Sequence, residues 1–104
     1  MSAVAVELTQ GGPGKLAVRG PLTFATARLA RETGLAALQG ANSSRTEIDL
    51  RGVTGSDSAG MAVLLDWLAS AKQSGRSLQF SNLPAQLQEL ARICDVLELL
   101  EKGV

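Results

Sequence analysis

Alternating apolar and polar residues predict two short strands near the start of the chain. The alternation runs through Ala3–Leu8 (AVAVEL) and Lys15–Arg19 (KLAVR), and a period of two is that of a half-buried strand. Gly11–Gly14, which lie between them, include a proline and supply turn geometry. Together with Lys15 this turn reads GGPGK, but it lacks the serine or threonine and the following helix of a phosphate-binding loop. We therefore expect a hairpin.

The next segment predicts a helix. Gly20 and Pro21 are expected to end the second strand. Thr23 is suited to cap an alanine-rich helix that runs to about Gln39, although Gly34 interrupts its otherwise favourable sequence. Turn-forming residues from position 40 to 44 then separate this helix from the next element.

The middle of the chain carries the clearest pattern. Thr46–Leu50 (TEIDL) predicts a third strand, with Ile48 and Leu50 on one face and Asp49 on the other. A helix should start near Ser58, because apolar residues then recur at helical spacing. This apolar stripe consists of Met61, Leu64, Leu65, Leu68 and Ala71.

The closing segment predicts one more strand and one more helix. Gly75 is a natural helix stop, Ser77–Phe80 (SLQF) reads as a fourth strand, and Pro84 fits the first turn of a helix. The inner stripe of that helix would be Leu87, Leu90, Ala91 and Cys94. Val96–Leu100 (VLELL) is apolar enough to pack as a helical turn or as a short strand.

This order of elements predicts an α/β fold. Two opening strands followed by alternating helices and strands favour one domain over residues 1–104. Its mixed sheet of about four strands should have helices packed mainly on one side.

Composition excludes several classes of function. The chain has no histidine and one cysteine, which excludes imidazole catalysis, histidine-ligated metals and an intrachain thiolate cluster, so we expect no cofactor and no metal. A net charge of zero and 3% aromatic residues argue against a nucleic-acid partner. No apolar run is long enough for membrane insertion, and MSAVAVELTQ lacks the basic leader of a secretory signal. These features lead us to expect a cytoplasmic protein.

The junction between the third strand and the following helix gathers short residues: Ser56, Asp57, Ser58, Ala59, Gly60 and Met61. Asp57 or Ser58 could simply cap the helix. A catalytic serine is the weakest alternative, because the chain has no histidine and no lysine or second carboxylate lies nearby in the sequence to act as a base. A small-anion or nucleotide site has little further support. The fourth alternative is a docking surface or switch at Ser58, where the helix dipole favours an added phosphate although Asp57 would repel it. Local physics does not separate capping from docking.

A family resemblance favours docking. Residues 48–75, IDLRGVTGSDSAGMAVLLDWLASAKQSG, resemble the signature of the STAS family (sulfate transporter and anti-sigma factor antagonist domains), with Met61 in the usual leucine place. The later SLQFSNLPAQLQELARICDVLELL resembles the closing strand, helix and apolar turn of that family. The similarity is good from about Glu47 onward and mostly topological before Ser44.

The resemblance implies one of two non-enzymatic roles. In MlaB-type STAS subunits of Mla phospholipid ABC transporters, which maintain outer-membrane lipid asymmetry, the domain binds and supports the ATPase subunit. The protein would then be peripheral to the inner membrane through its partner. In anti-sigma factor antagonists, the domain binds an anti-sigma factor kinase and is switched off by phosphorylation at the position of Ser58. The helix sequence from Gly60 onward resembles the MlaB-type branch more closely. Membership of that branch would place residues 56–61 at the contact with the ATPase.

Three further residues need interpretation. Trp67 lies beside the apolar stripe and is expected to pack on a neighbouring helix, the alternative being an interface anchor. Cys94 lies on the apolar face of its helix, so a buried, inert thiol is expected. Arg51 follows the third strand and is expected to be a solvated surface residue, although it could contact an acidic partner.

Overall fold

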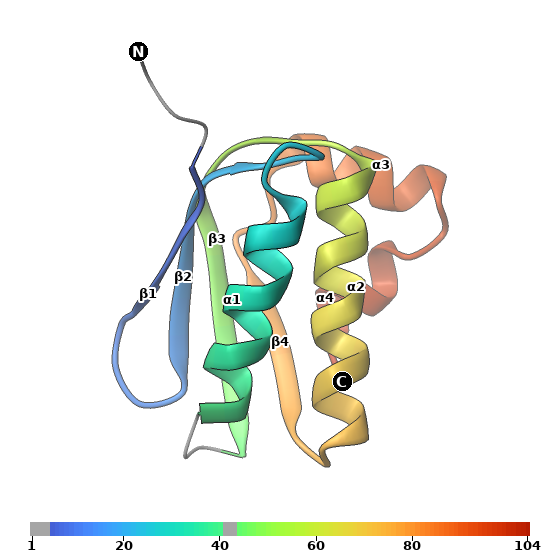
Figure 1. Ribbon diagram of the computed structural model, residues 1–104. Coiled ribbons are helices and arrows are strands. Elements are labelled where there is room, and N and C mark those ends of the chain that lie inside the picture. Colours follow the sequence, from blue (N-terminus) through green and yellow to red (C-terminus); the bar gives the residue numbers. More distant parts are fainter. Residues whose placement is uncertain (1–4, 41–43) are drawn as a thin grey trace.

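One mixed sheet organises the protein in the computed structural model, which describes residues 5–40 and 44–104. Strands β1 and β2 form the predicted hairpin, and β3 pairs in parallel with both β2 and β4, giving the order β1-β2-β3-β4 (Figure 1). The elements in chain order are β1 (Glu7–Gln10), β2 (Lys15–Leu22), α1 (Ala27–Gly40), β3 (Arg45–Ser56), α2 (Ser58–Gln73), β4 (Ser77–Ser81), α3 (Ala85–Ile93) and α4 (Leu97–Lys102).

Only one face of the sheet carries the core. Along β3, Ile48 and Leu50 are buried, whereas Glu47 is exposed and Asp49 is half-buried on the opposite face, as the alternation predicts. The same alternation continues in β4, where Phe80 is buried and the neighbouring residues are more open. Helices α1 and α2 lie side by side across the covered face in Figure 1. The predicted α/β fold, with a four-stranded mixed sheet and helices mainly on one side, is confirmed.

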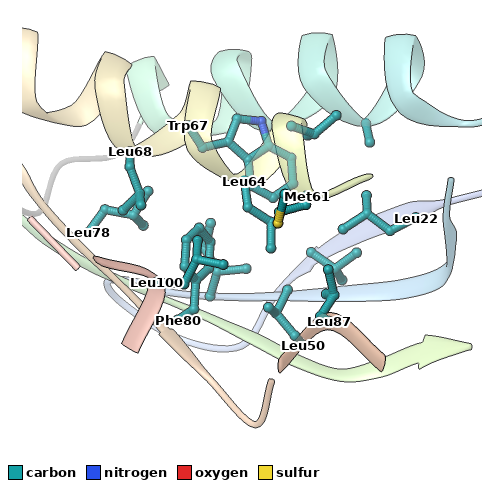
Figure 2. Close-up of a cluster of buried hydrophobic side chains, with 14 of the residues drawn as sticks. Leu22, Leu50, Met61, Leu64, Trp67, Leu68, Leu78, Phe80, Leu87 and Leu100 are labelled. Atoms are coloured by element: carbon teal, nitrogen blue, oxygen red, sulfur yellow. The ribbon is translucent and has the colours of Figure 1, made fainter. Parts of the chain in front are cut away.

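Helix α2 contributes the largest share of the core. Its buried face is broader than the predicted stripe, because Val63 and Trp67 are also buried while Leu65 is only half-buried. The extra width arises because α2 packs against both the sheet and α1. Figure 2 shows its side chains meeting residues from every layer, including Leu22, Leu50, Leu78, Phe80, Leu87 and Leu100.

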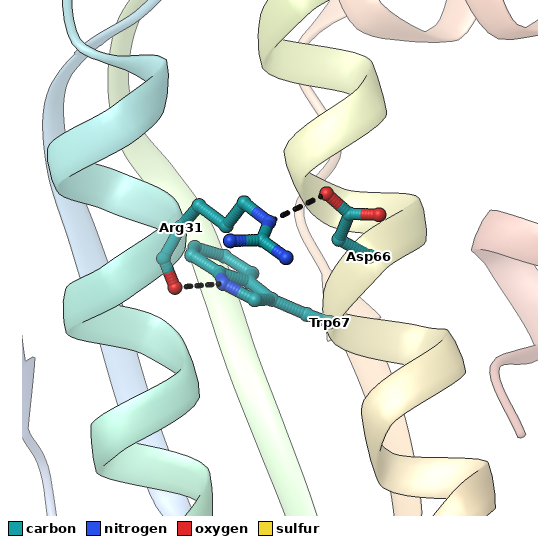
Figure 3. A network of polar contacts seen from close by, with 3 residues as sticks. All are labelled: Arg31, Asp66 and Trp67. Atoms are coloured by element: carbon teal, nitrogen blue, oxygen red, sulfur yellow. Dashed lines mark hydrogen bonds and ion pairs between the residues drawn. The ribbon is translucent and has the colours of Figure 1, made fainter.

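Trp67 joins α2 to α1 and is not an exposed anchor. Its side chain is fully buried, and its indole N–H donates a hydrogen bond to the carbonyl oxygen of Arg31 at 3.3 Å. The Arg31 side chain lies over the indole and its Nε is 3.0 Å from a carboxylate oxygen of Asp66 (Figure 3). Gly34 leaves the space that the indole occupies, since a Cβ there would overlap the ring. Helix α1 continues through Gly34 without a break. The expected packing of Trp67 on a neighbouring helix is confirmed.

Two predicted boundaries in the first part of the chain are wrong. Strand β2 does not end at Gly20–Pro21 but continues to Leu22, because irregularities in its register with β3 let the strand pass these residues. Helix α1 begins at Ala27, four residues after the expected cap, because Thr26 closes a turn first. The Thr26 hydroxyl accepts a hydrogen bond from the N–H of Thr23 at 3.0 Å and donates one to the Pro21 carbonyl at 2.7 Å.

Other boundaries follow the predictions more closely. The first strand begins at Glu7; its predicted first two residues lie outside the described part of the chain, as do three residues of the predicted turn at positions 41–43. Helix α2 ends before Gly75, whose positive φ of 69° suits a glycine. The apolar tail forms a helix, α4, and not a strand. Beyond it, Val104 exchanges backbone hydrogen bonds with Leu78 at the outer edge of β4.

The expectation for Cys94 is wrong. Its side chain is exposed, because α3 ends at Ile93 and the chain turns through Asp95, which has a positive φ of 61°. Helix α3 therefore ends one residue before Cys94, so the thiol is not held against the core. The inward residues Leu87 and Ala91 are buried as predicted.

Candidate partner-binding site at the start of α2

Asp57 caps helix α2. It has extended backbone geometry, and its Oδ1 accepts a hydrogen bond from the N–H of Gly60 at 3.1 Å. This is the arrangement in which a short acidic side chain satisfies one of the free N–H groups at a helix start. The capping alternative is thus confirmed for Asp57. The neighbouring Ser58 is therefore not needed as the helix cap.

Asp57 also holds a distant loop. Its Oδ2 accepts a hydrogen bond at 3.0 Å from the N–H of Phe24, which lies between β2 and α1. This bond to Phe24, followed by the bond to Gly60, lowers the pKa of the Asp57 carboxyl and outweighs the effect of burial. The carboxylate is therefore ionised at neutral pH, and it fixes the β2–α1 loop beside the start of α2.

The glycine and methionine of the signature face inward. Gly60 is buried against β2, and a Cβ on it would overlap the carbonyl oxygen of Leu22. Met61 is 6% exposed and belongs to the core (Figure 2). Ala59 is half-buried. The absence of a side chain at Gly60 thus serves close packing inside the domain, although the family resemblance places this residue at the contact with the ATPase.

Ser58 is exposed at the mouth of a groove between the start of α2 and α3. The groove has a volume of about 470 Å³ and is lined by Ser56, Asp57, Ser58, Gln86, Glu89, Leu90 and Ile93. No other part of the described chain lies over the Ser58 side chain closely enough to bury it. A hydroxyl at this place can be reached by another macromolecule.

Ser56 lies in the wall of this groove in an unusual polar environment. It is 6% exposed, and its hydroxyl has no hydrogen-bond partner among the residues that the structure describes. Its backbone N–H donates to Oε1 of Gln86 at 3.2 Å, which ties the end of β3 to α3. A buried hydroxyl without a partner is costly, so this site is not optimised for stability of the isolated domain.

Sequence reasoning missed two exposed apolar residues at this end of the molecule. Phe24 is 84% exposed beside Asp57, and Ile93 is 72% exposed in the lining of the groove. The position of Ile93, off the predicted stripe of α3, is a signal that could have identified it. Phe24 stood at the first position of the predicted helix, and the sequence carried no comparable signal for its exposure.

The described residues offer little to reaction chemistry. They contain no group of three or more metal-ligating side chains that could hold an ion.

The GGPGK segment is a hairpin turn as predicted, closed by the bond from the Gly11 N–H to the Lys15 carbonyl at 2.9 Å. Arg51 is exposed, and its backbone N–H donates a hydrogen bond to the Asp49 carboxylate at 2.8 Å. Of the helices described, none combines the length and apolarity needed to cross a membrane.

Comparison with known proteins identifies the family. The model of a family described as "Mlab, STAS domain" matches residues 6–101. The chain belongs to the STAS domain family. This agrees with the resemblance of the Asp57–Met61 signature, and the match also covers the N-terminal part, where the sequence resemblance was mostly topological.

A solved structure supports the STAS fold independently. The anti-sigma factor antagonist SpoIIAA in its unphosphorylated form superposes with a TM-score of 0.64, covering 86% of this chain and 83% of that one. The two sequences are 13% identical, so this likeness concerns the fold. No curated protein sequence matches the chain. STAS domains are in general regulatory or interaction domains, which agrees with the exposed site at Ser58.

Proposed function

We propose that this STAS domain is a non-enzymatic subunit that binds the ATPase subunit of an Mla-type phospholipid ABC transporter and supports its activity. Such a transporter maintains outer-membrane lipid asymmetry, and the protein would lie on the cytoplasmic side of the inner membrane through its partner. The family match to the Mlab type favours this branch. The contact surface we propose is centred on Ser58, with Ser56, Asp57 and Ala59 around it.

The proposal rests on the different roles of Asp57 and Ser58 at the start of α2. Asp57 satisfies the helix N-terminus and the β2–α1 loop, so Ser58 is not needed for capping. Its hydroxyl is nevertheless exposed at the mouth of a groove. An exposed hydroxyl at a helix start, next to an open groove, fits protein recognition better than catalysis, because the two carboxylates in the groove lining already have partners: Asp57 accepts two backbone N–H bonds and Glu89 pairs with Arg92.

Substitution of Ser58 tests the proposal. Ser58→Arg should leave the fold intact, since the side chain is exposed, but abolish capture of the ATPase subunit in a pull-down with purified proteins. Ser74→Arg, at the exposed far end of the same helix, is the matched control and should bind as the wild type does. Undiminished capture by Ser58→Arg would remove Ser58 from the contact surface.

The likeness to SpoIIAA favours a second candidate function, an anti-sigma factor antagonist regulated by phosphorylation of Ser58. The exposed hydroxyl is open to a kinase, and the helix N-terminus would stabilise a phosphate. The ionised Asp57 next to it would oppose this gain. Incubation with an anti-sigma factor kinase and ATP, followed by mass spectrometry, distinguishes the two functions: phosphate on Ser58 supports the antagonist, and an unmodified chain supports the transporter subunit.

A further inference from the structure

Of the four exposed large apolar residues in the described chain, Ile93 lines the groove and Phe24 lies next to Asp57 in its wall. The aromatic residues of the chain are two phenylalanines and one tryptophan, and of these Trp67 and Phe80 are buried in the core. Phe24 is 84% exposed, and Ile93, at 72%, is the next most exposed large apolar residue among those that the structure describes. Ile93 belongs to the groove lining, and the backbone N–H of Phe24 is bonded to Asp57 in the same lining, although the two residues lie far apart in the sequence. Exposed aromatic and aliphatic side chains held at one place are typical of residues that anchor a partner.

Hydrogen bonds hold these anchors in position. The backbone of Phe24 is fixed by Asp57, and the turn that carries it is closed by the Thr26 hydroxyl. Ile93 lies on α3, whose Gln86 side chain accepts a hydrogen bond from the backbone of Ser56. The backbone segments that carry both apolar groups are therefore held in place before any partner arrives, which reduces the entropic cost of binding.

The charged residues in the groove lining favour an occupant of opposite charge. The charged residues in its lining are Asp57 and Glu89, and both are acidic. The oxygens of Asp57 accept bonds from backbone N–H groups, which leave its formal charge in place. Glu89 pairs with Arg92 at the exposed rim, where such a pair is weak and exchangeable. An occupant with a positive charge beside an apolar group would match both features.

We propose that the groove receives an apolar side chain of the ATPase subunit that has a lysine or arginine next to it, with Phe24 and Ile93 as the anchors on this protein. This inference rests on the proposed function and names the partner chemistry of the same site. It extends the contact surface from the STAS signature to the β2–α1 loop and to α3.

Measured affinity of the full chain for the purified ATPase subunit tests the anchors. Phe24→Ala and Ile93→Ala should each weaken binding about tenfold or more, as truncation of an anchoring residue does. Leu29→Ala is the matched control: Leu29 is a 52% exposed leucine of α1 outside the groove, and its loss should change affinity less than about twofold. All three side chains are exposed, so folding should be unaffected.

Charge reversal tests the basic neighbour. Glu89→Lys should weaken binding more than Glu101→Lys, which places the same charge on the exposed surface of α4. The difference should shrink as the salt concentration rises, because exposed charges are screened. Equal effects of the two variants would overturn the assignment of a basic residue to the occupant.

The outcomes separate this inference from the function on which it rests. Wild-type protein that fails to bind the ATPase subunit overturns the proposed function. Wild-type binding that is lost in Ser58→Arg but unchanged in Phe24→Ala and Ile93→Ala overturns the anchors alone. Wild-type protein that sediments as a dimer, and as a monomer after Phe24→Ala, also overturns the inference, because the ring would then bind a second copy.

Discussion

Replacement of Asp57 by alanine should destabilise the isolated domain by about 2 kcal/mol. The loss of the N-cap bond to Gly60 costs about 1 kcal/mol in typical helices. The loss of the bond from the Phe24 N–H adds about 1 kcal/mol, less than the roughly 1.5–3 kcal/mol typical of a charged acceptor, because this bond is exposed to water. The two contributions act on different elements, so both should appear in the free energy of unfolding.

Asparagine at the same position separates the two bonds. An asparagine side chain caps helices about as well as aspartate, but it has one acceptor oxygen where the carboxylate has two. Asp57→Asn should therefore keep the bond to Gly60, lose the bond to Phe24 and destabilise the domain by about 1 kcal/mol. The difference between the two variants measures the cap, and the difference between Asp57→Asn and wild type measures the loop bond.

Urea denaturation at neutral pH, with the midpoint and slope fitted for each variant, is the appropriate measurement. Equal stabilities of the alanine and asparagine variants would contradict the assignment of two separate bonds. An alanine variant within about 0.5 kcal/mol of wild type would show that Asp57 does not hold the loop.

Three more predictions concern stability. The pKa of Asp57 is lower in the folded than in the unfolded chain, so its stabilising contribution is fully present above about pH 4 and is lost as the pH falls through the folded-state pKa; an acid titration of wild type against Asp57→Asn measures this difference. Gly34→Ala should lower the thermal midpoint, by overlap with Trp67 that costs about 1–3 kcal/mol and exceeds the gain in helix propensity, whereas Gly40→Ala, with open space around it, should not. An unchanged midpoint in Gly34→Ala would contradict this packing. Ser56→Ala should stabilise the isolated domain by about 1 kcal/mol in calorimetry, because it removes a buried hydroxyl without a partner; destabilisation would reveal a bond to that hydroxyl.

The elements that the sequence predicts well are those in which local pattern and tertiary packing agree. Residues 46–50 alternate between a buried and an open face, and the sheet uses that alternation without change. The stop at Gly75 and the helix after Pro84 depend on backbone preferences that act over a few residues. The signature around Asp57 also combines a local cap with a family pattern, so both its helix start and its place at an open surface could be anticipated.

The features that were missed depend on contacts between distant segments. The passage of β2 through Gly20–Pro21 requires its irregular pairing with β3, which no local preference encodes. The packing of Trp67 on a neighbouring helix was predicted, but its full burial depends on the space that Gly34 of α1 leaves for the indole. The exposure of Phe24 follows from a loop that Asp57 fixes from 33 residues away. At the candidate site, therefore, the cap at Asp57 and the exposure of Ser58 could be anticipated, whereas the inward position of Gly60 and Met61 and the exposure of Phe24 required the assembled fold.

The burial of the sole tryptophan between α1 and α2 gives the protein an intrinsic spectroscopic reporter. Its fluorescence emission should be that of an indole shielded from water in the native state and should shift to longer wavelength when the two helices separate. Because the indole is buried away from the groove, a ligand that merely occupies the groove should leave the emission unchanged. A spectral change on complex formation would therefore signify that binding at one end of α2 alters the packing along its length.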